Sequence, residues 1–385
     1  MLVPATLPTN TRPLAVNNCD NRIIARVAAY IISPSLSKQL HPNQKGFVPG
    51  RQGSEHIHDL NEEFYSAIEE ERNQFILSID TKKAFDSIHV DYLHAVLRAL
   101  NLLEWLNHLV AGLYFEARVT PVFGSGHSDF WIDILRGVRQ GCPLSPLLFA
   151  IAFDPLIERL RTVAGVRTFA FADDLAFSAS SARFFSPIMA IISQFSAISG
   201  LGINTDKTAI IAAQDVDLRA WISTTCWPDL KQADEITYLG VRMGRLVNTE
   251  DVYEVAFDKL QKRARSFYPL TRTLTVYKRV LLVNIFLLPL LYYLFQFFHF
   301  PPRLSRLLDA ILRDLVIPLR TSYKLAHLFL PRRRVAVQVA LRHPWAHNNA
   351  LLSAQGDFAA WSGRTGAPSL PLQHAHTHTH PHRCL

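Results

Sequence analysis

Around residue 80 the spacing of the apolar residues changes from that of a strand to that of a helix, and an aspartate lies at the change. Phe75–Ile79 is a compact apolar run, interrupted only by a serine, and it has the length of a buried strand. Asp80 comes directly after it. After residues 81–87, a helical pattern begins, with four apolar residues on one face: Leu93, Val96, Leu97 and Leu100. The pattern therefore places Asp80 at the carboxyl end of a strand, where the backbone turns before a helix.

A second acidic position interrupts an alternating pattern. Large and small apolar residues alternate through 169–172 (Phe-Ala-Phe-Ala) and again through 175–177 (Leu-Ala-Phe). Asp173 and Asp174 lie between the two runs. This pattern predicts two short strands joined as a hairpin, with the carboxylates at its tip. Adjacent carboxylates repel each other, and Mg²⁺ is the hard cation that binds one or two carboxylates together with phosphate oxygens. An ordinary solvated turn is the alternative.

A third carboxylate on a neighbouring strand end would favour the metal interpretation. If Asp80 lies beside Asp173 and Asp174, the three side chains could hold two divalent ions about 3.5–4 Å apart. Such a pair of ions activates an attacking hydroxyl group and stabilises a leaving phosphate oxygen. The residues by themselves therefore predict nucleotidyl transfer and nothing more specific.

Periodic patterns elsewhere predict further helices and strands. We expect helices over 22–32, 57–68, 148–160 and 184–198, and strands over 131–135 and 208–211. Gly200 is expected to end the helix over 184–198.

Composition indicates a globular protein with a polyanionic partner. The 385 residues suffice for two or three packed subdomains, and 49% hydrophobic with 19% charged residues excludes a disordered chain. The formal net charge of +8 fits a nucleic acid. The four cysteines form no CxxC pair, which favours a reducing compartment: Cys19, Cys142, Cys226 and Cys384. No signal-peptide pattern opens the chain, so we expect a location in the nucleus or cytoplasm.

One stretch is apolar enough to suggest a membrane span. Residues 280–298 are interrupted only by Asn284, Pro289 and Gln296, and the stretch is long enough to cross a bilayer. Because Pro289 breaks the run and basic residues flank it, we expect two buried helices and no membrane partner. A membrane protein anchored by this stretch is the alternative.

An ordered set of motifs resembles the reverse transcriptase domain of non-LTR (LINE-type) retrotransposons. The motifs, spanning roughly residues 11–245, are 12–14 (Arg-Pro-Leu), 44–51, 79–87, 137–146, 171–174 (Phe-Ala-Asp-Asp), 200–208 and 238–240 (Tyr-Leu-Gly). Phe171 stands where this family usually has tyrosine.

The resemblance implies an α+β, right-hand polymerase fold. Residues 1–74 would form fingers that begin later than is usual in the family, and 75–240 a palm with an antiparallel sheet and flanking helices. Residues 241–330 would form a helical thumb. The remaining 331–385 would be a C-terminal extension whose His-rich, low-complexity tail we expect to be disordered.

The resemblance also implies an activity. The chain would be an RNA-directed DNA polymerase that adds deoxynucleotides to a primer 3′ end, as part of a retrotransposon-derived element. Asp80, Asp173 and Asp174 would bind two Mg²⁺ ions, with Mn²⁺ as a substitute. Lys207 would act as general acid toward the departing pyrophosphate, or would be an ordinary solvated lysine.

Substrate-binding residues follow from the same motifs. Lys45 and Arg51 would contact the triphosphate, or would be ordinary surface charges. Phe85 would lie under the sugar and exclude a 2′-hydroxyl group, unless it is simply a core residue. The segment under the templating base and incoming nucleotide would be Arg139, Gln140 and Gly141. The segment that holds the primer end would be Tyr238, Leu239 and Gly240.

The implied partners are an RNA template, a DNA primer or nicked DNA target, and deoxynucleoside triphosphates. Basic residues in the expected thumb can follow a phosphate backbone, or simply form a solvated face: Arg263, Arg265, Arg272, Lys278 and Arg279. No endonuclease or zinc knuckle is recognisable, so nicking would need a partner or a further segment.

Two other interpretations remain. The first is a catalytically inactive retroelement fragment that only binds nucleic acid, although the three aspartates and Gln140 are intact. The second is a group II intron-type reverse transcriptase, although no maturase or nuclease segment is recognisable.

Overall fold

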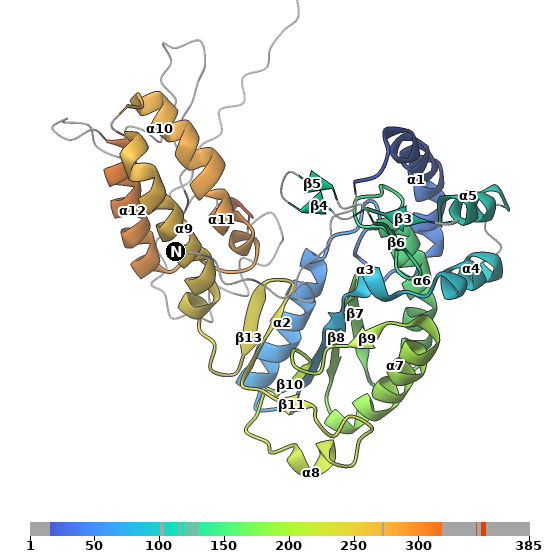
Figure 1. Ribbon diagram of the computed structural model, residues 1–385. Helices are drawn as coiled ribbons and strands as arrows, with labels where there is room; N and C mark the ends of the chain where they lie inside the picture. Colours follow the sequence, from blue (N-terminus) through green and yellow to red (C-terminus); the bar gives the residue numbers. More distant parts are fainter. Residues whose placement is uncertain are drawn as a thin grey trace, which may run out of the picture. The chain divides into compact units, whose positions relative to one another are not determined.

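The computed structural model describes residues 16–100, 104–114, 117–120, 122–123, 126–127, 130–271, 273–317, 344 and 348–351. The chain divides into two compact units, Met1–Asn248 and Thr249–Leu385 (Figure 1). The division falls shortly after residue 240, where the sequence motifs end. Three features noted in the sequence lie outside the described residues: the 12–14 motif, Arg272 and the His-rich tail.

A five-stranded sheet organises the first unit. Its order is β11-β10-β1-β8-β7, with β1 (Phe75–Ile79) in the centre. β1 pairs antiparallel with β10 (Ala209–Ala212) and with β8 (Asp174–Ala179), and β8 pairs antiparallel with β7 (Arg167–Phe171). Only β11 (Lys231–Gln232) is parallel to its neighbour. The strands predicted from the runs ending at Asp80 and flanking Asp173 are thus confirmed.

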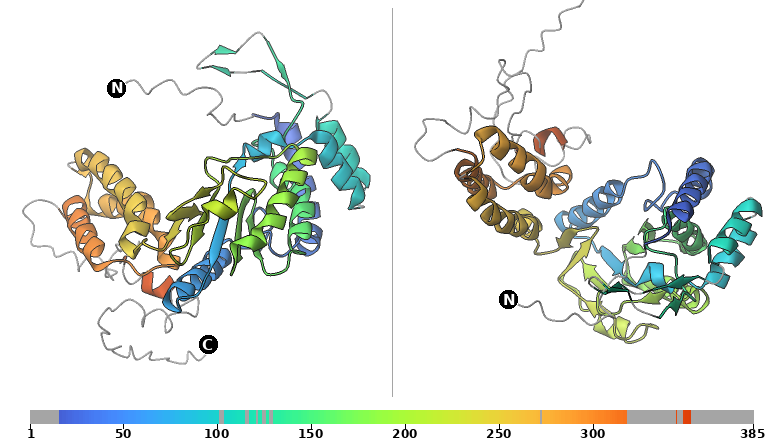
Figure 2. Two further views of the ribbon diagram at one scale, coloured as in Figure 1. Left: turned by 90° about the horizontal axis from the view of Figure 1, so that it is seen from below. Right: turned by 45° about the horizontal axis from the view of Figure 1, so that its top comes forward.

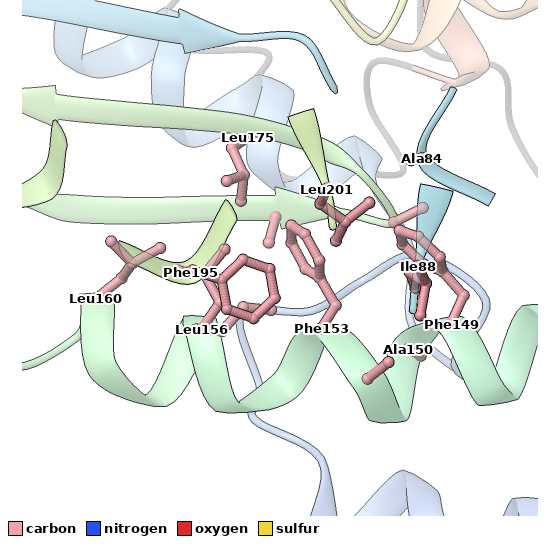
Figure 3. Packing of buried hydrophobic residues seen from close by; sticks show 14 of the residues in the cluster. Ala84, Ile88, Phe149, Ala150, Phe153, Leu156, Leu160, Leu175, Phe195 and Leu201 are labelled. Carbon is pink, nitrogen blue, oxygen red and sulfur yellow. The ribbon is translucent and has the colours of Figure 1, made fainter. Parts of the chain in front are cut away.

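Two helices, α6 (Ser145–Leu160) and α7 (Phe185–Ser199), cover one face of this sheet, and α4 (Val90–Ala99) packs against both of them (Figure 1). Figure 3 shows Phe153 and Leu156 of α6 pointing toward Leu175 of β8. Almost every residue of α6 is buried, because the sheet, α4 and α7 surround it. The predicted helices over 148–160 and 184–198 are confirmed, and α7 ends at Gly200 as expected.

One helix, α2 (Ser54–Glu69), lies against the opposite face of the sheet. The ring of His56 packs edge-on against Phe169 of β7, with 5.4 Å between ring centroids. Farther along α2, Glu63 accepts hydrogen bonds from Ser178 of β8 and Arg167 of β7. The sheet is therefore buried on both faces, which explains why its strands are apolar on both sides.

The first helix is longer than the sequence pattern indicates. α1 (Cys19–Gln39) extends the predicted 22–32 helix through Pro34. Proline lacks the N–H that would bond the carbonyl oxygen of Tyr30, one turn earlier, yet the helix continues past it to Gln39. The hydroxyl group of Ser33 donates to the carbonyl oxygen of Ala29 at 2.6 Å, beside this break. Conversely, the strand expected over 131–135 is only β6 (Ile132–Asp133), paired with β3 (Arg118–Val119).

The remaining elements of the first unit are helix α5 and several shorter helices, turns and strand pairs. They are α3 (Ala84–Ser87), α5 (Glu104–Tyr114), α8 (Arg219–Ile222), a 3₁₀ turn at Ala182–Phe184, β2 (Thr81–Lys82) with β9 (Gly202–Ile203), β4 (Val122–Phe123) with β5 (Gly126–His127), and β12 (Glu235–Tyr238) with β13 (Val241–Gly244) (Figure 2).

The second unit is helical. It contains α9 (Thr249–Thr271), α10 (Val276–Leu282), a π-helical turn (Val283–Leu287), α11 (Pro289–Tyr292), a 3₁₀ turn (Leu294–Gln296) and α12 (Pro302–Val316). The apolar stretch 280–298 was expected to form two buried helices, but it is divided among α10, the π-helical turn, α11 and the 3₁₀ turn. Ile285 and Phe286 in the π-helical turn are exposed, while most other apolar side chains of the stretch are buried or half-buried. Within the described residues, no helix combines the length and the apolar character needed to cross a membrane.

Candidate active site

The strand register brings the acidic residues to one end of the sheet. Ile79 of β1 lies opposite Leu175 of β8, so Asp80, which follows β1, is next to Asp174, the first residue of β8. The hydroxyl group of Thr81 donates to Oδ2 of Asp173 at 3.1 Å and connects the two strand ends.

The acidic pair lies where the β7–β8 hairpin turns: Asp173 is in the two-residue turn, and Asp174 is the first residue of β8. Phe171 pairs with Asp174, which leaves Ala172 and Asp173 as the turn residues. Ala172 has φ +56°, in the left-handed region that costs a non-glycine residue about 1–2 kcal/mol. Because its backbone is held in this conformation, the turn projects Asp173 beyond the end of the sheet.

Asn204 fixes the carboxylate of Asp80. Its side-chain amide donates to Oδ2 of Asp80 at 2.8 Å, and its backbone N–H donates to the Asp80 carbonyl oxygen at 2.8 Å. Asn204 lies beside Asp80 because β2 and β9 pair antiparallel, with Thr81 opposite Ile203. Lys207 follows in the same turn, with Nζ 3.8 Å from Oδ2 of Asp80 and 70% of its side chain exposed. The predicted general acid is therefore close to Asp80 and accessible.

The donor set fits a hard cation only in part. Within the described residues, no three His, Cys, Asp or Glu side chains gather closely enough to hold a metal ion. The carboxylates of Asp80 and Asp173 nevertheless lie at the same sheet end, and each is partly exposed. Since Mg²⁺ is commonly held by one or two carboxylates plus substrate phosphates, these residues fit an ion completed by a substrate and not an all-protein cage.

The loop over 137–141 lies against α3. The backbone N–H of Val138 donates to the carbonyl oxygen of Phe85 at 2.7 Å, and that of Gly137 donates to Ile88 at 2.7 Å. Gly137 has φ +85°, and a Cβ atom there would lie 2.7 Å from the backbone of Phe85 and Asp86. Glycine is therefore required for this approach.

Gln140 and Arg139 point in different directions from that loop. The amide of Gln140 donates to both carboxylate oxygens of Asp86, at 2.8 and 3.0 Å. Arg139 instead turns toward α5, where its guanidinium group lies 5.4 Å from the ring centroid of Tyr114 and donates to the carbonyl oxygen of Leu113. Gly141 is exposed beside them with φ +98°.

Phe85 occupies an aromatic stack and remains partly exposed. Its ring is stacked on Phe149 of α6 with 4.6 Å between centroids, and Phe47 meets it edge-on at 5.5 Å. Phe47 is itself 43% exposed. Phe85 is thus a core residue on one side, while the sugar-contacting role stays a prediction.

The two cations expected at the triphosphate have protein partners. The guanidinium group of Arg51 donates to four backbone carbonyl oxygens at 2.5–2.8 Å: those of Ser37, Leu40, His41 and Gln44. Lys45 forms an ion pair with Glu55. Arg51 therefore secures the end of α1, a role that the sequence did not indicate. Contact of either residue with a nucleotide stays a prediction.

The segment expected to hold the primer is the tip of the β12–β13 hairpin. Tyr238 pairs with Val241, and both turn residues, Leu239 and Gly240, have positive φ. This is the conformation favoured for two-residue hairpin turns. Tyr238 is only 2% exposed, so the turn is the accessible part. A Cβ atom at Gly53 would meet both Leu239 and the ring of Phe171, which shows how closely the three approach.

Basic residues of the second unit have two kinds of environment. Arg265 and Lys278 are exposed, whereas Arg279 donates to the carbonyl oxygens of Thr271 and Leu274 at the end of α9. Arg263, also exposed, donates to the carbonyl oxygen of Phe286. Two of the basic residues predicted from the sequence to follow a nucleic acid thus also bind backbone within the unit.

Comparison with known proteins places the chain in a family. The model of the reverse transcriptase (RNA-dependent DNA polymerase) family matches residues 4–243, more than half of the chain. The chain therefore belongs to this family, and its relatives confirm a reverse transcriptase domain of the non-LTR retrotransposon type with an α+β, right-hand polymerase fold.

The chain is similar to part of two insect Pol polyproteins. The retrovirus-related Pol polyprotein from the type-1 retrotransposable element R2 of Popillia japonica is 28% identical over 53% of this chain and 30% of that protein. The polyprotein from the type-2 element R2DM of Drosophila melanogaster is 27% identical over 62% of this chain and 24% of that protein. The chain thus spans less than a third of the length of these curated relatives.

Among solved structures, an apo telomerase from Candida Tropicalis aligns with 80% of this chain and 53% of that chain, at a TM-score of 0.47 and 11% identity.

Proposed function

We propose that this chain is an RNA-directed DNA polymerase that adds deoxynucleotides to a primer 3′ end on an RNA template. One observation carries the proposal: Asp80 and the Asp173–Asp174 turn lie at one end of the same sheet, where the Thr81 hydroxyl group connects them. Membership of the reverse transcriptase family supplies the reaction class.

Three carboxylates would provide the metal site. Asp80 and Asp173 would hold two Mg²⁺ ions, with Asp174 as the third acidic group and Mn²⁺ as a substitute. When bound, such ions lower the pKa of an attacking 3′-hydroxyl group and stabilise the departing pyrophosphate oxygen.

The chain's own residues would orient these groups. Asn204 keeps the Asp80 carboxylate in place through its amide. Lys207, 3.8 Å from Asp80 and exposed, would donate a proton to the departing pyrophosphate. Gln140, held by Asp86, would face the nascent base pair together with Arg139 and Gly141, while Phe85 would limit space at the sugar.

Subdomain roles follow the same proposal. Residues 1–74 would act as fingers, 75–240 as the palm and 241–330 as the thumb. The exposed basic side chains of α9, Lys259, Lys262 and Arg265 among them, would attract the phosphate backbone of an RNA–DNA duplex without reading its sequence.

The partners would be an RNA template, a DNA primer or nicked DNA target, and deoxynucleoside triphosphates, met in the nucleus or cytoplasm. Nicking of DNA would be carried out by a partner or by a further segment of a longer protein.

Primer extension tests the proposal. The parent chain, Asp173→Ala and Asp217→Ala are compared on poly(rA) with oligo(dT), dTTP and Mg²⁺. Asp217 is an exposed aspartate paired with Arg219, and it serves as the matched control. We expect extension by the parent and the control, and none by Asp173→Ala. Folded parent protein that binds the duplex without extending it would contradict the polymerase and leave a nucleic-acid-binding fragment.

A further inference from the structure

A loop from the first part of the chain lies along the strand that leads into the acidic turn. The backbone N–H of Lys45 donates to the carbonyl oxygen of Ala170 at 2.9 Å, and the N–H of Ala170 donates to Asn43 at 3.3 Å. Gln44 and Ala170 thereby form a parallel bridge at the edge of β7. The loop is thus continuous with the sheet two residues before Ala172.

The side chain of Gln44 completes this contact at Ala172 itself. Its Nε2 donates to the carbonyl oxygen of Ala172 at 3.1 Å, and its Oε1 accepts from the N–H of Ala172 at 2.8 Å. The same Oε1 accepts from the N–H of Gly46 at 2.9 Å. Gln44 has no solvent exposure. A single buried amide therefore satisfies both backbone polar groups of the residue that precedes Asp173.

This contact acts on a backbone conformation that alanine rarely adopts. Ala172 has φ +56° and is buried. If Gln44 were removed, both buried backbone groups of Ala172 would lose the partner described above, and the left-handed conformation would lose its support. The turn would then relax, and the direction of the Asp173 side chain would change with it.

Two neighbours keep the loop in place. A Cβ atom at Gly46 would lie 2.1 Å from the backbone nitrogen of Ala172, so only glycine permits this approach. On the other side, Nη1 of Arg51 donates to the carbonyl oxygen of Gln44 at 2.8 Å. These two contacts fix the backbone of the loop, so the side chain of Gln44 starts from a fixed position beside the turn.

We propose that Gln44 is a positioning residue for Asp173: its amide holds Ala172 in the left-handed conformation and thereby directs the carboxylate of Asp173 toward the reacting groups. This inference rests on the proposed polymerase function, because only then is Asp173 a catalytic residue. Gln44 itself does not touch the substrates. Its effect would appear in kcat and not in binding of the primer–template.

Three variants of the full chain separate positioning from folding. Gln44→Met keeps the volume and removes both hydrogen bonds to Ala172, together with the one that Oε1 accepts from Gly46. Gln52→Met makes the same change at an exposed glutamine of the same loop and is the control. Gln44→Met combined with Ala172→Gly gives residue 172 the left-handed conformation at no steric cost.

We expect kcat for dTTP addition to fall roughly tenfold or more in Gln44→Met, with the KM for dTTP and the Kd for the primer–template within about threefold of the parent. Gln52→Met should match the parent. The double variant should recover a substantial part of kcat. Unchanged kcat in Gln44→Met, or an equal fall in both single variants, would overturn the proposal while leaving the polymerase intact.

Gln44→Glu supplies a pH signature. A protonated glutamic acid can donate to Ala172 and accept from it as the amide does, whereas the ionised form can only accept. Burial raises the pKa of a carboxyl group at such a position. The kcat of Gln44→Glu relative to the parent should therefore be highest at acidic pH and fall as the pH rises. A ratio independent of pH would argue against a donated hydrogen bond.

Hydrogen exchange tests the contact without any activity. The Ala172 amide should be protected in the parent and should exchange faster in Gln44→Met, while the amides of β1 stay protected in both. Equal exchange at Ala172 would show that Gln44 does not hold the turn, whether or not the parent extends a primer. An inactive parent with the expected exchange difference would instead contradict the proposed function alone.

Discussion

Gln140 donates both of its amide hydrogen bonds to a single carboxylate, that of Asp86, at 2.8 and 3.0 Å. The two residues belong to different motifs, 54 positions apart in the chain. Asp86 lies in the short helix α3, from which its carboxylate reaches the loop over 137–141. It orients the residue that is expected to face the nascent base pair.

Asp86→Ala should therefore weaken nucleotide use. The loss of a hydrogen bond to a charged acceptor costs about 1.5–3 kcal/mol, so kcat/KM for dTTP should fall roughly tenfold or more. Asp86→Asn keeps one acceptor oxygen, so its kcat/KM for dTTP should fall less. Single-nucleotide addition measures the effect, with Asp91→Ala, an exposed acid on α4, as the control. Equal values for the two alanine variants would contradict the role.

Asn204→Ala should reduce the rate of addition by about tenfold. The variant removes the amide that holds Oδ2 of Asp80, while the backbone hydrogen bond between the two residues remains. Stability should change little because the site is partly exposed. Thr205→Ala, at an exposed position in the same turn, is the matched control. Primer extension together with a thermal melt distinguishes this outcome from a folding defect.

Two glycine-to-alanine substitutions should change the free energy of unfolding in opposite directions. In Gly137→Ala the new Cβ atom would meet the backbone of α3 at 2.7 Å, so we expect a loss of about 2 kcal/mol in the free energy of unfolding. In Gly112→Ala the Cβ atom on helix α5 meets nothing within 4 Å, so we expect a gain of about 0.5–1 kcal/mol. Urea unfolding measures both. A stable Gly137→Ala would show that the loop is not packed on α3.

His56 should make stability depend on pH. Burial, with a smaller contribution from Lys45, lowers the pKa of His56 to about 4, against about 6.5 in the unfolded chain. Because the unfolded state binds the proton more tightly, the stabilisation is fully present above pH 6.5. It is lost as the pH falls toward 4, by up to about 3 kcal/mol.

Urea unfolding between pH 7 and pH 4 checks this. His56→Leu should lose part of the acid sensitivity, so that its stability relative to the parent rises as the pH falls. His108→Leu, at an exposed histidine of α5, should follow the parent. Parallel curves for the parent and His56→Leu would contradict the assignment.

Local sequence patterns were sufficient to predict the strands and the turn that carry the aspartates, but not the residues that hold them in place. The run ending at Asp80 and the alternation around Asp173 depend only on neighbouring residues, so strands and hairpin could be recognised. That Asn204 would reach Asp80, or Gln44 reach Ala172, depends on tertiary contacts between residues more than 100 positions apart. Single-sequence periodicity carries no information about such pairs.

Arg51 shows the converse difficulty. A cation in a Gly/Pro-rich loop suggests a phosphate ligand, but this one satisfies four carbonyl oxygens where α1 ends. The last carbonyl groups of any helix lack partners within the helix. An arginine 12 residues after the last residue of α1, from Gln39 to Arg51, is thus a signal that could have indicated the structural role.

The two-residue turn between β7 and β8 restricts how the gene can change in length. A codon inserted or deleted within residues 167–179 would shift one strand by a single position and exchange its inward and outward side chains. Leu175 would then point toward the opposite face of the sheet, where α2 lies, and the aspartates would leave the end of β1. Between Lys82 and Arg167, by contrast, the described residues add no strand to the five-stranded sheet. An insertion in a loop that joins two helices of this segment would therefore leave the pairing of β1, β8 and β7 unchanged.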